Sequence, residues 1–307
     1  MNTELVSVIV PTYQGCNVIK RAVDSVLNQT YPNIEVIVVD DNSPSSQERK
    51  DTETAMSKYE GNDKVIYIRH ERNKNGAAAR NTGIRHAHGQ FIAFLDDDDW
   101  FLPEKVEKQL QYLLSYHEYA ACYCLAQREG KAIPTTAYQG DVTKELLLMK
   151  SCMFTPSLFF RKEVFVSLDG FDESFKRHQD YELLLRFFHQ GYKMGCVEAV
   201  LLELGTGAGN NIPSAENLYE LKQIFLERFS YAINNTDQSD PGFKNKTYAL
   251  HYGRVFEAYV VEHHFVEALR LANKYIWCSP SYFTYSFRRR VSGFIKRRLY
   301  GLIGRQR

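Results

Sequence analysis

The 307-residue sequence lacks any long hydrophobic run, and its apolar stretches have the length of strands, as in Phe91–Leu95. A membrane-spanning helix needs about 20 consecutive apolar residues, so no span is predicted. No basic segment precedes the first apolar run at Val6 and no cleavage site follows it, so no secretory signal is expected. With 44% hydrophobic and 24% charged residues, wholesale disorder is excluded, and the sequence favours a soluble, intracellular protein.

The six cysteines are scattered and contain no C-x-x-C pair, and none of the nine histidines belongs to an H-E-x-x-H pair. Structural zinc sites usually use closely paired ligands, and thiol redox centres usually use C-x-x-C. The sequence therefore predicts reduced thiols, most of them in the core, and no structural zinc site.

A net excess of charge is also absent, because 38 basic residues face 37 acidic ones. The charges are nevertheless unevenly distributed. Residues 268–307 contain ten basic residues and no acidic one, which leaves 28 basic and 37 acidic residues, a formal charge of −9, in the first 267. The sequence thus combines an acidic body with a basic tail.

The first hundred residues alternate short β-branched runs with amphipathic stretches. Four strands are predicted at Val6–Val10, Ile34–Val39, Val65–Arg69 and Phe91–Leu95. Helices are predicted between them at residues 18–27 with Asn17 as N-cap, at 46–59 and at 76–87. This order indicates an α/β fold in which right-handed crossovers join parallel strands.

The pattern is less regular after Trp100. Helices are predicted at residues 103–116 and 180–190, and strands at residues 120–125, 157–160 and 194–197. The glycine- and asparagine-rich segment 205–213 is the best boundary in the chain. We read it as a linker or as a loop that could cover a bound ligand. Three further helical stretches, at residues 215–231, 248–263 and 266–275, suggest a small C-terminal bundle.

Polar residues follow three of the predicted parallel strands. They are Pro11-Thr12-Tyr13, Asp40-Asp41-Asn42-Ser43 and Asp96-Asp97-Asp98-Asp99. Ligands of an open parallel sheet bind beyond the carboxyl ends of its strands. Each acidic segment taken alone is also ordinary turn sequence.

The four consecutive aspartates are harder to explain as a solvated turn. Carboxylates that follow a buried strand repel one another, and a divalent cation would offset that cost. Oxygen ligands without histidine or cysteine suit Mg²⁺ or Mn²⁺, with substrate phosphates filling other coordination positions. The sequence therefore predicts a metal–nucleotide site.

Several motifs in this order resemble family 2 glycosyltransferases, which implies the GT-A fold, a Rossmann-like and mostly parallel sheet flanked by helices, with a C-terminal helical extension. The resemblance covers residues 6–205 and rests on five stretches: Val6–Tyr13, Ser25–Ser43, Asn75–Ile84, Ala87–Trp100 and Gly170–Arg186. It implies a glycosyltransferase domain at residues 1–205, with a nucleotide-sugar half (1–100) and an acceptor half (101–205), followed by a helical region at 206–307.

The resemblance also implies roles for individual residues. Donor binding falls to Pro11, Thr12, Tyr13, Asp40, Asp41, Arg80, Asp96 and Asp97. Asp98 is the implied metal ligand and Asp180 the implied catalytic base. Gln179 departs from the family pattern, in which glutamate is common before this aspartate. From the residues alone, Asp180 could merely begin or cap its helix, and Arg80 could be a solvated helix position.

The implied activity is inverting, metal-dependent transfer of a sugar from a nucleotide-diphosphate donor, most simply a UDP-sugar. The acceptor would be a saccharide or a polyprenyl-linked saccharide in capsule, lipopolysaccharide or other cell-surface polysaccharide assembly. A processive synthase is disfavoured because spans and a Q-x-x-R-W motif are absent. A sugar nucleotidyltransferase is disfavoured because no glycine-rich loop follows the first strand. A non-catalytic membrane-surface adaptor remains a third reading.

The basic tail, residues 282–307, interleaves arginines with aromatic residues. Such a sequence can contact an anionic membrane, and it can also pack on the acidic body. No nucleic-acid-binding motif accompanies it, so no nucleic-acid partner is expected. The expected location is the cytoplasm, with peripheral attachment to the inner face of the plasma membrane.

Overall fold

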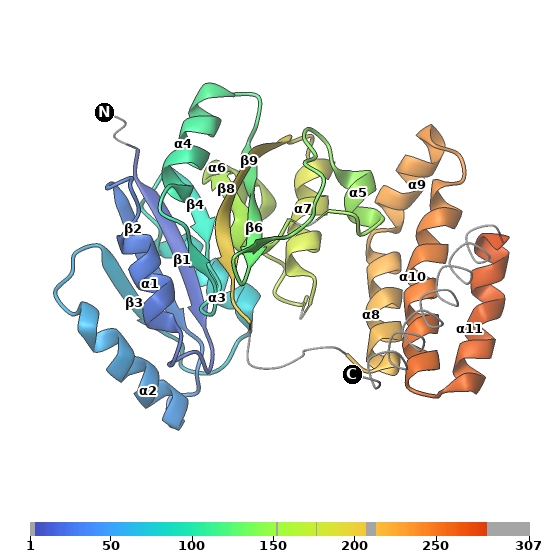
Figure 1. Ribbon diagram of the computed structural model, residues 1–307, viewed down its shortest axis with the longest axis horizontal. Coiled ribbons are helices and arrows are strands. Elements are labelled where there is room, and N and C mark those ends of the chain that lie inside the picture. The colour runs from blue at the N-terminus through green and yellow to red at the C-terminus, as the bar shows by residue number, and fades with distance from the viewer. Residues whose placement is uncertain (1–3, 152, 176, 207–212, 281–307) are drawn as a thin grey trace, which may run out of the picture. The chain divides into compact units, whose positions relative to one another are not determined.

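The computed structural model describes residues 4–151, 153–175, 177–206 and 213–280. Cys152 and the basic tail at residues 282–307 lie outside the described residues. The chain divides into two compact units, Met1–Gly209 and Asn210–Arg307. The first is a mixed α/β unit and the second is helical (Figure 1).

The first half of the α/β unit is the predicted alternation of strands and helices. Four parallel strands pair in the order β3-β2-β1-β4: β1 (Val6–Thr12), β2 (Ile34–Asp40), β3 (Val65–Arg69) and β4 (Phe91–Phe94). They are joined by α1 (Ile19–Leu27), α2 (Gln47–Met56) with a 3-10 turn (Ser57–Tyr59), and α3 (Gly76–His86). Every residue of β2 is buried, as expected for a strand covered on both faces.

The prediction of Asn17 as the N-cap of the first helix is wrong. The N-cap of α1 is Val18, whose side chain makes no capping hydrogen bond. The backbone N–H groups of Val18 and Ile19 instead both donate to the carbonyl oxygen of Gly15. The turn at Gly15 therefore starts the helix, and no side-chain acceptor is required.

The second half of the unit extends the same sheet with strands of both directions. These strands are β5 (Trp100–Phe101), β6 (Ala121–Arg128), β7 (Lys131–Ala132), β8 (Leu158–Arg161) and β9 (Met194–Leu204). The full order is β3-β2-β1-β4-β8-β6-β9-β5, with β7 paired to β6. β8 is antiparallel to β4 and to β6, whereas β6 and β9 are parallel. The parallel arrangement is thus confined to the first four strands and this one later pair.

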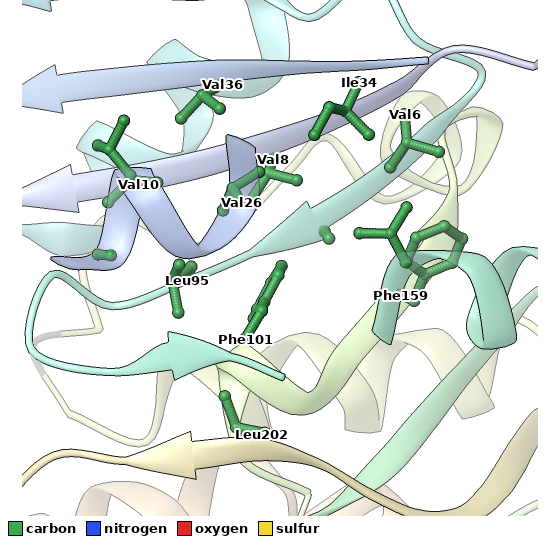
Figure 2. Close-up of a cluster of buried hydrophobic side chains, with 14 of the residues drawn as sticks. Val6, Val8, Val10, Val26, Ile34, Val36, Leu95, Phe101, Phe159 and Leu202 are labelled. Carbon is green, nitrogen blue, oxygen red and sulfur yellow. The ribbon is translucent and has the colours of Figure 1, made fainter. Parts of the chain in front are cut away.

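Alternating residues of β1 pack on opposite faces of the sheet. Val8 and Val10 lie in one core cluster with α1 residues such as Val26, and with Phe101 and Leu202 (Figure 2). On the other face, a Cβ on Gly83 of α3 would come within 2.3 Å of Ile9. The absence of a side chain at this position lets α3 approach β1 closely and fixes the helix that carries Arg80.

Four helices accompany the later strands: α4 (Lys105–Ser115), α5 (Thr143–Leu147), α6 (Glu163–Leu168) and α7 (Gln179–His189). α7 is anchored by a run of buried apolar residues from Leu183 to Phe188, interrupted only by a partly buried arginine. Because that face is buried, the first turn of α7, with Gln179 and Asp180, is held in a defined place.

The second unit contains α8 (Ala215–Arg228), α9 (Ser230–Ser239), α10 (Phe243–Val261) and α11 (Phe265–Cys278). Its core cluster includes Val255 and Tyr259 of α10 and Leu271 of α11. The helix predicted at 215–231 is interrupted at Phe229, and helix continues to Ser239 where none was predicted. None of the described helices is both long and apolar enough to cross a bilayer.

Candidate active site

The carboxyl ends of β2, β1 and β4 lie next to one another at one edge of the sheet. This follows from their parallel pairing, in which Thr12 at the end of β1 is in register with Asp40 at the end of β2. β4 ends at Phe94, and the four aspartates begin two residues later. The segments that the sequence singled out are therefore neighbours in space.

An arginine ties the aspartate segment to the start of α7. Arg80 of α3 donates from one terminal nitrogen to Asp96 Oδ1 at 2.5 Å and from the other to Gln179 Oε1 at 2.8 Å. Arg80 is only 9% exposed, so the reading as a solvated helix position is wrong. Its Nε has no hydrogen-bond partner among the described residues, although it is buried. Arg80 thus brings a positive charge into the site with one donor unused.

Asp180 follows Gln179 in the first turn of α7 and is partly buried. Burial raises the pKa of Asp180 to about 6, and the Asp96 carboxylate adds to this rise, while the backbone N–H of Tyr181 and the charge of Arg80 oppose it. Charge interactions with both Arg80 and Asp96 place this carboxyl beside the aspartate segment. The N-cap of α7 is His178, so Asp180 does not cap the helix.

Asp97 is held by the end of β1. Thr12 donates its hydroxyl to Asp97 Oδ2 at 2.6 Å. Burial, with smaller contributions from the charges of Asp96 and Asp98, raises the pKa of Asp97 to about 6 against the hydrogen bonds from Thr12 and the backbone of Tyr13. A Cβ on Gly15 would lie 1.9 Å from the same carboxylate oxygen. The turn after β1 therefore approaches Asp97 so closely that only glycine fits.

We expect Gly15→Ala to weaken donor binding more than it weakens the fold. The new methyl group must push away the Asp97 carboxylate, which Thr12 holds, whereas the backbone at Gly15 does not need a left-handed conformation. Inserting an extra methyl group into a tightly packed site typically lowers the free energy of unfolding by about 1–3 kcal/mol. Calorimetry of nucleotide-sugar binding beside a melting curve would check this. Unchanged affinity in a destabilised protein would show that this contact supports only folding.

Asp98 and Asp99 point to different partners. Arg21 of α1 donates to the backbone oxygen of Asp98 at 2.6 Å and stacks on Trp100, 3.8 Å from the ring centroid. Burial and the charge of Asp96 raise the pKa of Asp98, while a backbone N–H and the charges of Arg21 and Arg128 oppose the rise. Asp99 Oδ1 accepts the backbone N–H of Gly205 at 2.8 Å. Because Arg21 contacts the backbone oxygen of Asp98, that contact leaves the Asp98 carboxylate available to a ligand.

Asp40 is fully engaged within the protein. It is 0% exposed, its Oδ2 lies 3.1 Å from Arg49 Nε and accepts the hydroxyl of Tyr67, and its Oδ1 accepts from Asn42. These contacts explain how an aspartate can end a buried strand. They also leave little capacity for a nucleotide, so in the structure Asp40 acts as an anchor beneath the site.

Replacing Asp40 with alanine should destabilise the protein by about 3–5 kcal/mol, because Arg49 is then buried without a counter-charge. The chemical denaturation midpoint would report the loss. Asp63→Ala, which removes an exposed aspartate before β3, is the matched control and should change little. Equal stability of the two variants would contradict the anchoring role.

Asp41 organises the loop before α3. Its Oδ1 lies 2.7 Å from His70 Nδ1 and accepts the backbone N–H of Lys74, and its Oδ2 accepts that of Asn75. Asn75 in turn caps α3 by accepting from the N–H groups of Ala77 and Ala78. Asp41 therefore fixes the start of the helix that carries Arg80.

Pro11 and Tyr13 complete the edge at the end of β1. Pro11 is partly buried within the strand, and Tyr13 is 53% exposed. Of the predicted donor-binding side chains, Tyr13 is the most accessible. The structure therefore gathers Thr12, Asp96, Asp97, Asp98, Arg80 and Asp180 around one region. Asp40 and Asp41 are buried at the end of the neighbouring strand β2.

Two contributors, Arg21 and Gly15, were not predicted from the sequence, and Gly205 was predicted only as part of the linker or loop at residues 205–213. A Cβ on Gly205 would meet the backbone oxygen of Asp98 at 2.1 Å. Gly205 directly follows β9 and is more than a hundred residues from the aspartates in the sequence. Only the pairing of β9 within the sheet therefore brings the two together. Arg21 lies on a predicted helix, and a basic residue one turn after its start is an ordinary surface feature.

The residues present fit a divalent ion that is completed by its substrate. Among the described residues, no group of three or more histidine, cysteine, aspartate or glutamate side chains could hold a metal alone. Asp98 nevertheless offers a carboxylate beside that of Asp96, and burial together with the Asp96 charge raises its pKa. Mg²⁺ and Mn²⁺ commonly bind through one or two carboxylates, with phosphate oxygens and water completing the coordination.

Comparison with known proteins gives the same fold and defines the class. The structure resembles Staphylococcus aureus TarS (residues 1–349) in complex with UDP-GlcNAc, with a TM-score of 0.61, 19% identity and 91% of each chain covered. It also resembles the mannosyltransferase PcManGT from Pyrobaculum calidifontis in complex with GDP-Man and Mn²⁺, with a TM-score of 0.59, 18% identity and coverage of 93% of this chain and 86% of that one. The fold is therefore of the GT-A class.

The family follows from the sequence comparison. The family model described as glycosyl transferase family 2 matches residues 7–165, and the chain belongs to this family. An uncharacterized glycosyltransferase of Rickettsia bellii is 34% identical over 194 residues, which cover 60% of this chain and 27% of that protein. Bacillus subtilis TuaG, named for teichuronic acid biosynthesis, is 40% identical over 111 residues, 36% of this chain and 42% of that one. The chain thus spans less than half the length of each of these two relatives.

Proposed function

We propose that this protein is an inverting glycosyltransferase that transfers a sugar from a nucleoside-diphosphate donor, UDP-linked in the simplest case, to a hydroxyl of a saccharide or lipid-linked saccharide. Membership of family 2 supports the reaction class. The name of the Bacillus subtilis relative supports an acceptor in cell-surface polysaccharide assembly. The complexes of the two structural neighbours, with UDP-GlcNAc and with GDP-Man and Mn²⁺, support a nucleotide-sugar donor and a divalent metal.

One observation carries the proposal: Arg80 joins Asp96, in the aspartate segment, to Gln179, the neighbour of Asp180. A carboxylate that could accept a proton is thereby held beside the carboxylates and the cation that suit a sugar diphosphate. Proton removal from the acceptor and departure of the diphosphate must occur on opposite sides of one sugar carbon, so both groups have to be fixed relative to each other.

In the proposed mechanism, Asp180 accepts the proton of the acceptor hydroxyl as its oxygen attacks the anomeric carbon. The new oxygen–carbon bond forms while the bond from that carbon to the diphosphate oxygen breaks, which inverts the anomeric configuration. A divalent ion held by Asp98 would stabilise the negative charge of the diphosphate. Arg80, buried with one free donor, adds a fixed positive charge to the same region. Thr12 holds Asp97 in position.

Gln179 is an uncharged hydrogen-bond partner of Arg80, at a position where glutamate is common in the family. Arg80 has one anionic partner, Asp96, and one neutral partner, Gln179. The net charge around Arg80 is therefore less negative than it would be if a second carboxylate took the place of Gln179. The departure from the family pattern is thus compatible with catalysis, because the proton acceptor is Asp180.

The same proposal assigns a function to each part of the chain. Residues 1–100 contribute the donor side, and residues 101–205, which include Asp180, contribute the acceptor side. The helical region from 206 would serve localisation, with the basic tail at residues 282–307 contacting an anionic membrane at the cytoplasmic face.

A thermal-shift screen of nucleotide sugars with Mn²⁺ tests the proposal directly. A ligand at about 100 times its Kd stabilises the folded protein by about 2.7 kcal/mol, which is a shift of several degrees for a domain of this size. We expect one nucleotide class to raise the melting temperature, and the same compound to be converted to the free nucleoside diphosphate when acceptor is added. No shift with any uridine, guanosine or thymidine conjugate would contradict donor binding.

The pH dependence supplies a further check on Asp180. A general base works only when ionised, and burial raises the pKa of Asp180 to about 6. The transfer rate should therefore be full above that pH and should fall as pH decreases through about 6. Gln179→Glu adds a negative charge beside Asp180 and should move this acid limb to higher pH. A limb at the same pH in both proteins would show that another group controls it.

A further inference from the structure

Among the described residues, large hydrophobic side chains are exposed mainly in one part of the second unit. Seven of them lie between residues 260 and 277: Val260, Val261, Phe265, Val266, Leu269, Ile276 and Trp277. Trp277 is 80% exposed and Leu269 is 75% exposed. Apolar residues scattered singly over a surface are ordinary, but a contiguous group marks a contact surface.

Val260 and Val261 end α10, and the other five side chains lie on one side of α11. The opposite side of this helix packs into the core through Ala268, Leu271, Ala272 and Tyr275. With 3.6 residues per turn, Phe265, Leu269 and Ile276 fall on one line along the helix, and Val266 and Trp277 lie beside it. Exposed Asn273 lies between these two rows and accepts the indole N–H of Trp277 at 2.8 Å. We call this side, with Phe265, Val266, Leu269, Ile276 and Trp277, the outer face of α11. The helix is thus apolar on two sides, and only one of them is buried.

Positive charge borders the outer face. Arg270 and Lys274 are exposed and follow Val266 and Trp277 around the helix. The only acidic residue of α11 is Glu267, in its first turn. From Ala268 to the end of the sequence there are ten basic residues and no acidic one. An apolar strip with a border of basic residues is the pattern of a helix that lies in the surface of an anionic bilayer.

We propose that the outer face of α11 binds the surface of a phospholipid bilayer with anionic head groups. The apolar side chains enter the boundary between head groups and acyl chains, where the indole of Trp277 is also favoured. Arg270 and Lys274 then lie at the level of the lipid phosphates. This surface is separate from the carboxylate site of the first unit, and the inference goes beyond the proposed transfer reaction.

Charge favours an anionic bilayer over two other possible partners of the outer face: a second copy of the chain and the chain's own residues 281–307. A second copy of the chain packing face to face would bring the Arg270 and Lys274 side chains of both copies together. The chain's own residues 281–307 carry eight basic residues and no acidic one, so covering the face with them would also gather like charges. Anionic lipid is the partner that complements both the apolar strip and its border.

Flotation of the full chain with lipid vesicles tests the proposal. Vesicles of phosphatidylcholine alone are compared with vesicles that also contain phosphatidylglycerol, at low and high salt. We expect binding only to the anionic vesicles and weaker binding at high salt. The double variant Leu269→Asp/Trp277→Asp should lose at least about tenfold in bound fraction, since charges at exposed positions spare the fold but not lipid insertion. Val166→Asp alters an equally exposed valine of α6 and should bind like the unaltered chain.

A second measurement does not depend on that variant folding. Trp277 is one of two tryptophans, so in a Trp100→Phe background its fluorescence reports the outer face alone. A blue shift on adding anionic vesicles would support insertion. Equal flotation of the double variant and of Val166→Asp, or tryptophan emission unchanged while the chain is bound, would overturn the proposal. So would a dimer of the unaltered chain that Leu269→Asp/Trp277→Asp converts to a monomer, because the face would then be a contact between copies.

Discussion

Asp180→Asn should lower the rate of sugar transfer by about 10²–10⁴-fold while leaving donor binding nearly unchanged. Asparagine has the same shape as aspartate but cannot accept a proton from the acceptor hydroxyl. The hydrogen bond from the backbone of Tyr181 can still form to the amide oxygen, so the start of α7 should keep its conformation. Single-turnover assays with saturating donor would measure the loss.

A matched control for this variant is Asp169→Asn. Asp169 is exposed at the end of α6 in a left-handed backbone conformation, which asparagine also adopts readily. The Asp169→Asn substitution removes one negative charge from the same unit, as Asp180→Asn does, but at a position outside the candidate site. Transfer by Asp180→Asn at the rate of this control, with intact donor binding, would show that another group is the base.

Asp98→Ala should lower transfer by roughly 10²–10³-fold and should also weaken donor binding in the presence of Mn²⁺. The Asp98 carboxylate lies among the four aspartates that follow β4, and burial together with the charge of Asp96 raises its pKa. Its removal takes away the ligand expected to hold the ion beside the diphosphate. The Arg21 contact would survive, because it is made to the backbone oxygen of residue 98.

Asp63→Ala again serves as the control for loss of a carboxylate, because Asp63 is exposed before β3. If Asp98→Ala retained metal-stimulated transfer, the ion would be held elsewhere. If it lost donor binding equally with and without metal, Asp98 would contact the nucleotide sugar itself. Rates measured across a range of Mn²⁺ concentrations distinguish these outcomes.

The first half of the fold could be predicted because its local signals agree with its topology. The β-branched runs of β1 and β2 and the apolar stripe of α1 each point to the same parallel arrangement, and the structure confirms it. The later strands were found, but their directions depend on pairings between distant residues, such as Ile92 with Phe160. Two-residue strands such as β5 leave no periodic signal, and α9 is too polar to give a clear one.

The candidate site was only partly predictable for a related reason. A run of four aspartates identifies the segment, but not the direction in which each carboxylate points. Asp96 pairs with Arg80, Asp97 with Thr12, and Asp99 with the backbone of Gly205, and each of these partners is set by tertiary structure. The same holds for Asp40, whose pairing with Arg49 depends on how α2 packs beside β2.

The burial of Arg80 shows what the sequence could not reveal. A helix that contains Arg80 within an alanine-rich stretch gives no sign that this arginine is enclosed. It is enclosed because α7 and the aspartate segment converge on it from opposite halves of the unit. The contacts of Arg80 with Asp96 and with Gln179, the neighbour of Asp180, therefore form only when both halves of the α/β unit have folded together.

Calorimetric titration of the unaltered protein with its nucleotide sugar, with Mn²⁺ and again after chelation, addresses the metal-assisted site most directly. If the site at Asp96–Asp99 recognises the nucleotide sugar through a shared divalent ion, the affinity for the nucleotide sugar should fall at least about tenfold when the ion is removed. Adding Mn²⁺ should restore it. Equally tight binding before and after chelation would contradict that account.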